Sequence, residues 1–171
     1  MRRAEADREF EEFARASAGP LVAFGYALTG NQHDAWDLAQ EALLRLGRSW
    51  RRRDIASPWT YTRVTMVRLN ADRVRRTSHE TLTPDHGEIP SPQHVDVTDL
   101  HEWLIHALHQ LTPGQRAALA LKHMDGMNNA EIAEAMGCTE GTVRTHLSRG
   151  AAAIRAAQAG PINEENHHAR H

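Results

Sequence analysis

The feature that most constrains this chain is a stretch near its middle, residues 77–92, whose composition is unsuited to a folded core. It combines turn-forming residues with three prolines, Pro84, Pro90 and Pro92, and shows no apolar periodicity. Such a segment buries too little apolar surface to offset the backbone entropy lost on folding. The 171-residue chain is therefore expected to form two small modules joined by a linker.

Both flanking parts have the composition of helices. Gly and Pro are sparse within long stretches rich in Ala, Leu, Arg and Glu, and no window alternates apolar β-branched residues with polar ones. A hydrophobic content of 40% and a charged content of 25% exclude disorder throughout. The fold class expected is all-α, with two small helical domains.

No apolar stretch approaches the roughly 18 residues that a membrane span needs. The start of the chain is charged where a signal peptide would be apolar. We therefore expect a cytoplasmic protein without membrane insertion.

Four helices are expected before the linker, over residues 5–16, 20–29 and 34–50 and from Ser57–Pro58 to Val74. Apolar side chains recur at helical spacing in each segment. The Ser-Pro pair supplies a cap followed by proline at the first helical position. These helices should pack as one bundle.

The second part carries three helix-start signals. A helix over residues 100–111 precedes Thr112-Pro113-Gly114-Gln115, which has the capping-box pattern, and Asn128 to Glu131 repeats that pattern. Gly137 should end the short helix after Asn128, and Thr139 should cap the next one. A short helix, a glycine turn and a second helix with a polar face are typical of a helix-turn-helix; a hairpin used only for protein contacts is the alternative.

In a helix-turn-helix the second helix enters the major groove, where its first side chains meet base edges. Arginine can bind guanine through O6 and N7, glutamate can accept from cytosine, and hydroxyls suit phosphates or bases. The candidate upstream DNA contacts are Thr139, Glu140, Thr142, Arg144, Thr145, Ser148 and Arg149.

Charge is distributed unevenly, although the net charge is only −2. Residues 45–76 carry ten arginines against two acids, Asp54 and Asp72. A polyanion is the natural partner of such a segment. An ordinary solvated helix surface is the alternative.

Two motifs, one on each side of the linker, resemble the same family. Asp34-Ala35-Trp36-Asp37-Leu38-Ala39-Gln40-Glu41, continuing to Leu46, resembles the polymerase-clamping signature of sigma factors. Residues 111–116, 131–133, 141–144 and 148–150 resemble their promoter-binding helix-turn-helix. The resemblance covers nearly all of residues 5–158 and is strongest to the small extracytoplasmic-function (ECF) sigma factors, within them to the SigE-like group of actinobacteria.

The resemblance implies a set of polymerase contacts: Asp34, Asp37, Leu38, Gln40 and Glu41. Their acids would meet a basic coiled coil on the large polymerase subunit, and acids at a helix N-terminus are also favoured by the helix dipole. Trp36 departs from the family pattern, either as an exposed contact or as a residue that packs locally.

The resemblance also implies contacts with the minus-ten element, from Trp59, Arg63, Arg68, Asn70, Arg73, Arg75 and Arg76. Trp59 could stack on an extruded base, which is worth about 1–3 kcal/mol, or pack in the core. Arg68 stands where the family usually has asparagine, so the minus-ten preference is left open.

The domains expected are residues 5–77 for polymerase binding and minus-ten recognition, 78–98 for the linker, 99–158 for minus-35 recognition and 159–171 for a disordered tail. The partners implied are core RNA polymerase and promoter DNA, with an anti-sigma factor as a further candidate. The linker region, residues 78–102, contains six acids and no Lys or Arg, so it could shield a basic face or act as a passive tether.

The sequence offers little for catalysis or metal binding. His106 and His109 lack a neighbouring Cys or carboxylate to complete a metal site. Cys138 is expected to be a small buried residue rather than a redox switch. We expect no catalytic residues, metal or cofactor, and no enzyme. The competing functions are a stand-alone helix-turn-helix regulator and a metal-dependent helical enzyme, which would need paired Glu-x-x-His motifs that the chain lacks.

Overall fold

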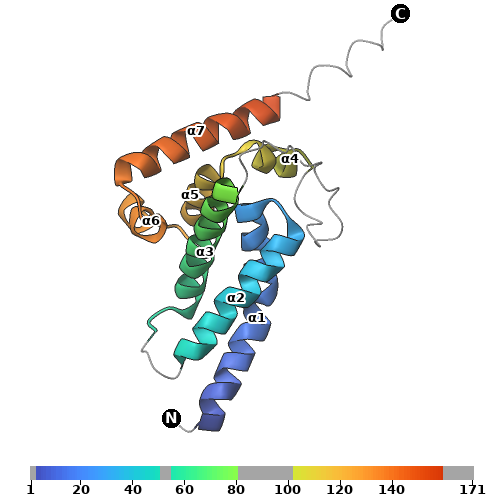
Figure 1. The fold of residues 1–171 in the computed structure, drawn as a ribbon, viewed down its shortest axis with the longest axis vertical. Helices are drawn as coiled ribbons and strands as arrows, with labels where there is room; N and C mark the ends of the chain where they lie inside the picture. Colours follow the sequence, from blue (N-terminus) through green and yellow to red (C-terminus); the bar gives the residue numbers. More distant parts are fainter. Residues whose placement is uncertain (1–2, 51–54, 81–101, 160–171) are drawn as a thin grey trace, which may run out of the picture.

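The computed structural model describes residues 3–50, 55–80 and 102–159, and every regular element in these ranges is an α-helix (Figure 1). The helices are α1 (Arg3–Thr29), α2 (Gln32–Trp50), α3 (Pro58–Glu80), α4 (Glu102–Gln110), α5 (Pro113–Met124), α6 (Asn129–Met136) and α7 (Glu140–Ala159). The expected all-α class is confirmed. Residues 78–80, expected in the linker, belong to α3, and both the rest of the linker and residues 160–171 of the tail lie outside the described residues.

Helix α1 runs through Pro20, so the expected division into two helices, 5–16 and 20–29, is wrong. Proline removes only one helical hydrogen bond here, the one to the Ala16 carbonyl. Ala16 and Pro20 are both exposed, so water can solvate that carbonyl. The apolar side chains before and after Pro20 pack toward the same core, which favours one continuous helix.

The first three helices pack as the expected bundle. Asn31 caps α2, because its Oδ1 accepts a hydrogen bond of 3.0 Å from the Asp34 backbone N–H. At Gly25 the backbones of α1 and α2 touch, since a Cβ there would lie 2.9 Å from the Ala35 carbonyl oxygen. The buried core side chains include Leu21, Phe24 and Leu28 of α1, Ala35, Ala42 and Leu46 of α2, and Met66, Val67 and Leu69 of α3.

The helix starts expected in the second part are confirmed. Thr112 and Asn128 each form a complete capping box, with Gln115 and Glu131 as the reciprocal partners. Gly137 ends α6 in the left-handed region at φ 66°, which glycine adopts without a steric penalty. The Thr139 hydroxyl accepts from the Thr142 backbone N–H at 3.2 Å and so caps α7.

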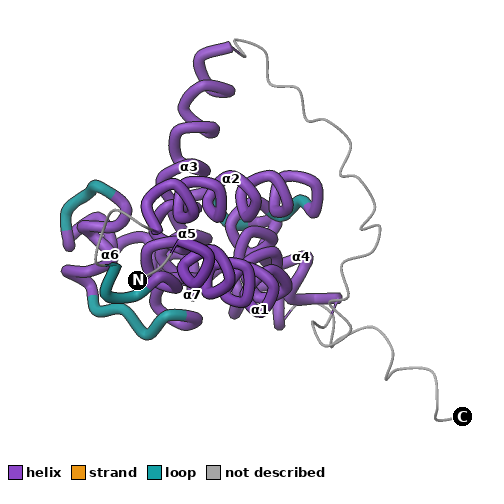
Figure 2. The backbone as a smooth tube through the Cα atoms, turned by 90° about the horizontal axis from the view of Figure 1, so that it is seen from below, coloured by secondary structure: helices purple, strands orange, loops and turns teal. Residues whose placement is uncertain are grey.

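The two halves of the chain are packed together rather than separated. Helix α5 lies against α1, and α6 lies against α3. Buried apolar side chains from both halves, such as Phe24 and Met66 from the first and Leu121 and Ile132 from the second, form one continuous cluster. The last turns of α3 project beyond this body (Figure 2).

Among the described helices, none has the length and apolar character that a membrane crossing requires.

Candidate nucleic-acid and protein interfaces

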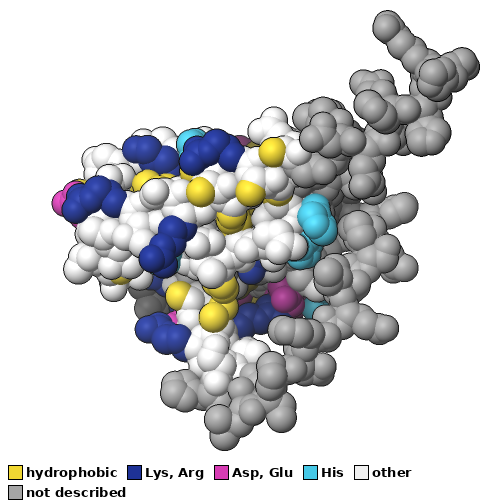
Figure 3. Space-filling view, turned by 90° about the horizontal axis from the view of Figure 1, so that it is seen from above, with side chains coloured by type: hydrophobic (Ala, Val, Ile, Leu, Met, Phe, Trp, Pro, Cys, Tyr) yellow, Lys and Arg dark blue, Asp and Glu magenta, His cyan; other side chains and the backbone are white. Residues whose placement is uncertain are grey.

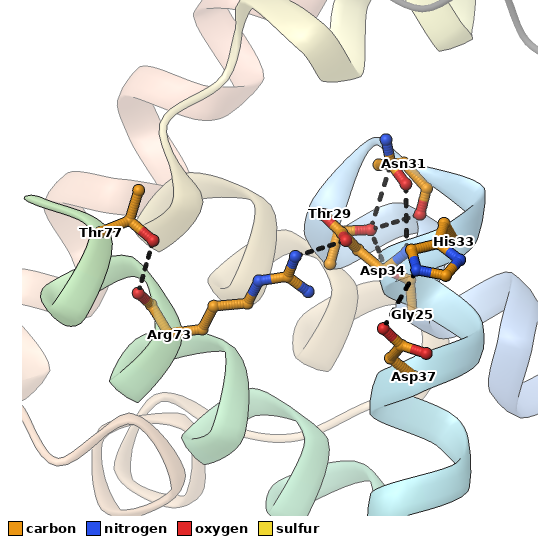
Figure 4. Close-up of polar contacts among 8 residues, drawn as sticks. All are labelled: Gly25, Thr29, Asn31, His33, Asp34, Asp37, Arg73 and Thr77. Atoms are coloured by element: carbon orange, nitrogen blue, oxygen red, sulfur yellow. Dashed lines mark hydrogen bonds and ion pairs between the residues drawn. The ribbon is translucent and has the colours of Figure 1, made fainter. Parts of the chain in front are cut away.

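The acidic residues of α2 divide into one that is tied to α3 and two that face solvent. Asp34 forms an ion pair with Arg73 of α3 (Figure 4). The Asp37 side chain is 57% exposed, and the His33 imidazole lies 3.5 Å from its carboxylate. Glu41 accepts a hydrogen bond of 2.8 Å from Arg45 on the same helix. Asp37 and Glu41 can therefore accept contacts from another molecule more readily than Asp34 can.

An apolar stripe accompanies these acids. Trp36 is 45% exposed and Leu44 is 56% exposed, and Gln40 lies between them at helical spacing, on the same side. The exposed position of Trp36 fits the contact interpretation rather than local packing. Leu38, by contrast, is buried in the core, so it can support this surface only from beneath. Leu44 was not among the contacts predicted from the sequence. Its spacing of four residues from Gln40 and eight from Trp36, which places all three on one side of the helix, could have revealed it.

The residues expected at the minus-ten element do not form one exposed surface. Arg63 is buried, and it pairs with the carboxylate of Asp125, which lies between α5 and α6. Its guanidinium carbon lies 4.3 Å from the centre of the Trp59 ring and 4.9 Å from that of Phe24. Trp59 is half-buried and packs edge-on against Phe13, as the core interpretation of this residue predicts.

Arg68 also faces the second half of the chain. Its Nε donates to the Ala135 carbonyl of α6 at 3.3 Å, and one terminal nitrogen lies 3.5 Å from the Glu134 carbonyl. These carbonyls lie at the C-terminal end of α6, where the helix dipole favours a cation. Asn70 is buried.

The end of α3 presents further exposed basic side chains of this set. Arg75 and Arg76 are exposed, and both contact Asp72 of the same helix. Arg73 remains 42% exposed while paired with Asp34. The structure thus divides the expected minus-ten residues into exposed arginines, Arg68, Arg75 and Arg76, with Arg73 partly exposed, and covered side chains, Trp59, Arg63 and Asn70.

The side chains expected at the minus-35 element lie together on α7 and its cap, and all seven are exposed. Gly141, Arg144, Thr145, Ser148 and Arg149 line a shallow hollow of about 360 Å³. Thr139 caps the helix. We expect Arg144 and Arg149 to reach a partner most readily, because their side chains are long and exposed. Figure 3, which views the molecule from the α7 end, shows several basic side chains spread over this face.

His109 and Arg116 meet the first half of the chain at Gly30, in the turn between α1 and α2. A Cβ at Gly30 would lie 2.9 Å from an Arg116 terminal nitrogen and 3.1 Å from the His109 ring. Burial, reinforced by the positive charges of Arg116 and His106, lowers the pKa of His109. Burial therefore disfavours the charged form of this imidazole.

The lone cysteine is partly buried and the described residues hold no cluster of metal ligands. Cys138 is a partly buried free thiol, and burial raises its pKa, which makes it less reactive. Across residues 3–50, 55–80 and 102–159, no three His, Cys, Asp or Glu side chains are grouped to hold a metal ion.

Comparisons with known proteins connect these surfaces to a family. Residues 13–80 match the model of sigma-70 region 2, and residues 101–154 match that of sigma-70 region 4. The ECF RNA polymerase sigma factor SigE of Mycolicibacterium smegmatis is 33% identical over 158 residues, which is 85% of this chain and 60% of that protein. The RNA polymerase sigma-E factor of Streptomyces coelicolor is 30% identical over 151 residues, 86% of this chain and 84% of that protein.

A solved structure supports the fold. The sigma factor RpoE, in a co-crystal with the anti-sigma factor NepR from Bartonella quintana, matches with a TM-score of 0.70 and 21% identity. The match covers 90% of this chain and 99% of that one. The chain spans about 60% of the length of the mycobacterial relative.

Proposed function

The chain belongs to the ECF family of RNA polymerase sigma factors, and we propose that it binds core RNA polymerase and directs transcription initiation at specific promoters. In this proposal residues 5–77 bind polymerase and the minus-ten element, and residues 99–158 bind the minus-35 element. The chain acts in the cytoplasm, where it positions polymerase on DNA, and catalyses no reaction itself.

The observation that carries this proposal is the presence of two separate exposed faces on one chain. The α7 face offers Arg144 and Arg149 for DNA. The α2 face offers acids beside an apolar stripe, which suits a basic amphipathic helix of another protein. A stand-alone helix-turn-helix regulator needs only the first face, so the second favours a sigma factor.

The candidate polymerase contacts are Asp34, Asp37, Gln40 and Glu41, with Leu38 supporting them from the core. An anti-sigma factor is a further candidate partner, since the structural match RpoE was solved with one. Such a partner would compete for the surfaces that polymerase or promoter DNA uses.

The first prediction tests the α2 face by charge reversal. Asp37→Arg with Glu41→Arg places positive charge opposite a basic partner, so retention of core polymerase in a pull-down should fall about tenfold or more. The matched control is Glu9→Arg with Glu12→Arg, which reverses two exposed acids of α1 and should leave retention unchanged. Equal retention by the wild type and the α2 variant would remove this face from polymerase binding.

A further inference from the structure

The side of α7 that turns away from the expected DNA contacts packs on α5 at two glycines. Helix α7 lies against α5 (Figure 1). Gly114 is the second residue of α5, and a Cβ built there would lie 2.7 Å from Cε1 and 2.8 Å from Nε2 of the His146 ring. The imidazole of α7 therefore rests directly on the backbone at the start of α5.

A second contact lies one turn further along α7, with the roles of the two helices reversed. A Cβ at Gly150 would lie 2.7 Å from Cδ1 of Leu119 and 3.4 Å from Cβ of Gln115, both on α5. Gly150 and Leu119 are buried. Each helix thus offers one glycine and one larger side chain, so α7 is fixed against α5 at two points about one turn apart.

These contacts set the position of the opposite side of α7. Successive residues of an α-helix are rotated by about 100°, so Arg144 and Ser148 lie about 160° around the helix axis from His146. Both side chains are exposed, and both line the hollow on α7. A displacement of α7 away from α5 therefore moves these two side chains by the same amount toward the partner that they face.

Direct contacts with bases tolerate little displacement. Hydrogen bonds between nitrogen and oxygen form over about 2.7–3.2 Å, and an arginine that binds guanine must place two of them at once. Contacts with phosphates are less demanding, because charge attraction falls gradually with distance. The packing of α7 on α5 therefore affects base preference more strongly than it affects total affinity.

We propose that His146 is a positioning residue for base recognition: its imidazole, resting on Gly114, sets the distance of α7 from α5 and so the reach of Arg144 toward a base edge. The proposal rests on the sigma-factor function, which supplies the role of α7 in reading the minus-35 element. The contact between Gly150 and Leu119 is the second support, and it prevents α7 from tilting about the first.

The test separates base preference from total affinity. The full-length wild type, bound to core RNA polymerase, first selects an upstream sequence from a library of randomised duplexes. Affinity is then measured for the selected duplex and for a shuffled version of it, and the ratio of these affinities is the base preference. The free energy of unfolding by urea, measured for each variant, shows whether its fold is intact.

We expect His146→Ala to reduce the affinity ratio about fivefold or more, while affinity for the shuffled duplex changes less than about twofold. Gly114→Ala should act in the same direction, because the added methyl group either pushes α7 outward or displaces the ring from its place on α5. This variant decides the matter if His146→Ala unfolds. Combining both substitutions should restore part of the ratio, because the methyl group then occupies part of the space that the ring has left.

His123→Ala and Gly19→Ala are the matched controls. The first removes an exposed imidazole from α5. The second adds a methyl group to a helical glycine at which a Cβ would meet no atom within 4 Å. Both variants should leave the affinity ratio unchanged.

An unchanged ratio in folded His146→Ala and Gly114→Ala proteins would overturn the positioning role. An equal loss of affinity for both duplexes would also overturn it, because a contact that only stabilises the fold acts in that way. A wild type that polymerase does not retain, or that selects no sequence, would reject the sigma-factor function together with the role that depends on it, so the two failures are distinguishable.

Discussion

Arg63 shows how one side chain can hold the two halves of the chain together. Its guanidinium is paired with Asp125 and stacked on Trp59, and removing one member of a buried ion pair costs about 3–5 kcal/mol. Burial raises the pKa of Asp125, while the hydrogen bond and charge of Arg63 offset part of that rise. The charged form of this carboxylate is therefore stabilised chiefly by Arg63.

At Arg144 the prediction concerns base specificity. This residue lies in the second turn of α7, is exposed, and lines the shallow hollow on that helix. Arg144→Ala should cost about 1–3 kcal/mol at the preferred site and should flatten the preference at one base pair. The measurement is a base-substitution scan of the upstream element with the polymerase-bound protein.

Arg155 provides the control for this scan, because it is exposed on the same helix about three turns further along. Arg155→Ala removes the same charge away from the expected bases, so it should affect all sequences equally and weakly. If Arg144→Ala also weakens every sequence equally, Arg144 is a phosphate contact and carries no specificity.

At the scale of helices, local chemistry made most of the fold predictable. The capping boxes at Thr112 and Asn128 and the left-handed Gly137 depend on residues within one turn of each other, so a single sequence reveals them. The α1 break was mispredicted because Pro20 was judged by its local effect alone. Whether a proline ends a helix depends on the packing on either side, which the local sequence does not contain.

The crossing of α1 and α2 gives a prediction of stability. Gly25→Ala would place a methyl group 2.9 Å from the Ala35 carbonyl oxygen and 3.0 Å from the Ala35 Cα, so two helix backbones would have to separate. Overpacking of this kind costs about 1–3 kcal/mol, and the free energy of unfolding by urea should fall by that amount.

Gly19→Ala in the same helix is the matched control. A Cβ at Gly19 meets no atom within 4 Å, so only backbone preferences change. Alanine favours a helix by about 1 kcal/mol over glycine, but the following proline disfavours a helical conformation at this position. The net change should be small, and a Gly25→Ala variant as stable as this control would show that α1 and α2 can move apart at little cost.

At the scale of the whole molecule, the packing of the two halves against each other was not predictable from the sequence. Asp125 precedes Gly126 in what reads as an ordinary turn, and it lies 62 residues from its partner Arg63. Charge counting identified the basic segment, and the family resemblance assigned its α3 arginines to the minus-ten element, since nothing local distinguishes Arg63 from Arg75. The candidate α7 face was more predictable, because one amphipathic helix specifies both its buried and its exposed side.

The last prediction concerns how pH changes the stability of the contact between the two halves of the chain. His109 lies against Gly30 and beside Arg116, and burial lowers its pKa below the ordinary value of 6.5. A group whose pKa is lowered in the folded protein takes up its proton more readily in the unfolded chain, so acidification through this range destabilises the fold. Lowering the pH from about 7.5 to about 6 should reduce the free energy of unfolding by urea.

His109→Gln isolates this contribution from that of other titrating groups. Glutamine keeps a polar side chain of similar reach without a titratable nitrogen, so the free energy of unfolding of this variant should vary less with pH than that of the wild type. Asp125 acts in the opposite sense, because burial raises its pKa in the folded protein and its protonation therefore favours the folded state. Since both proteins retain Asp125, the difference between their two pH curves reports the imidazole alone, and parallel curves would show that His109 does not contribute to the pH dependence of stability.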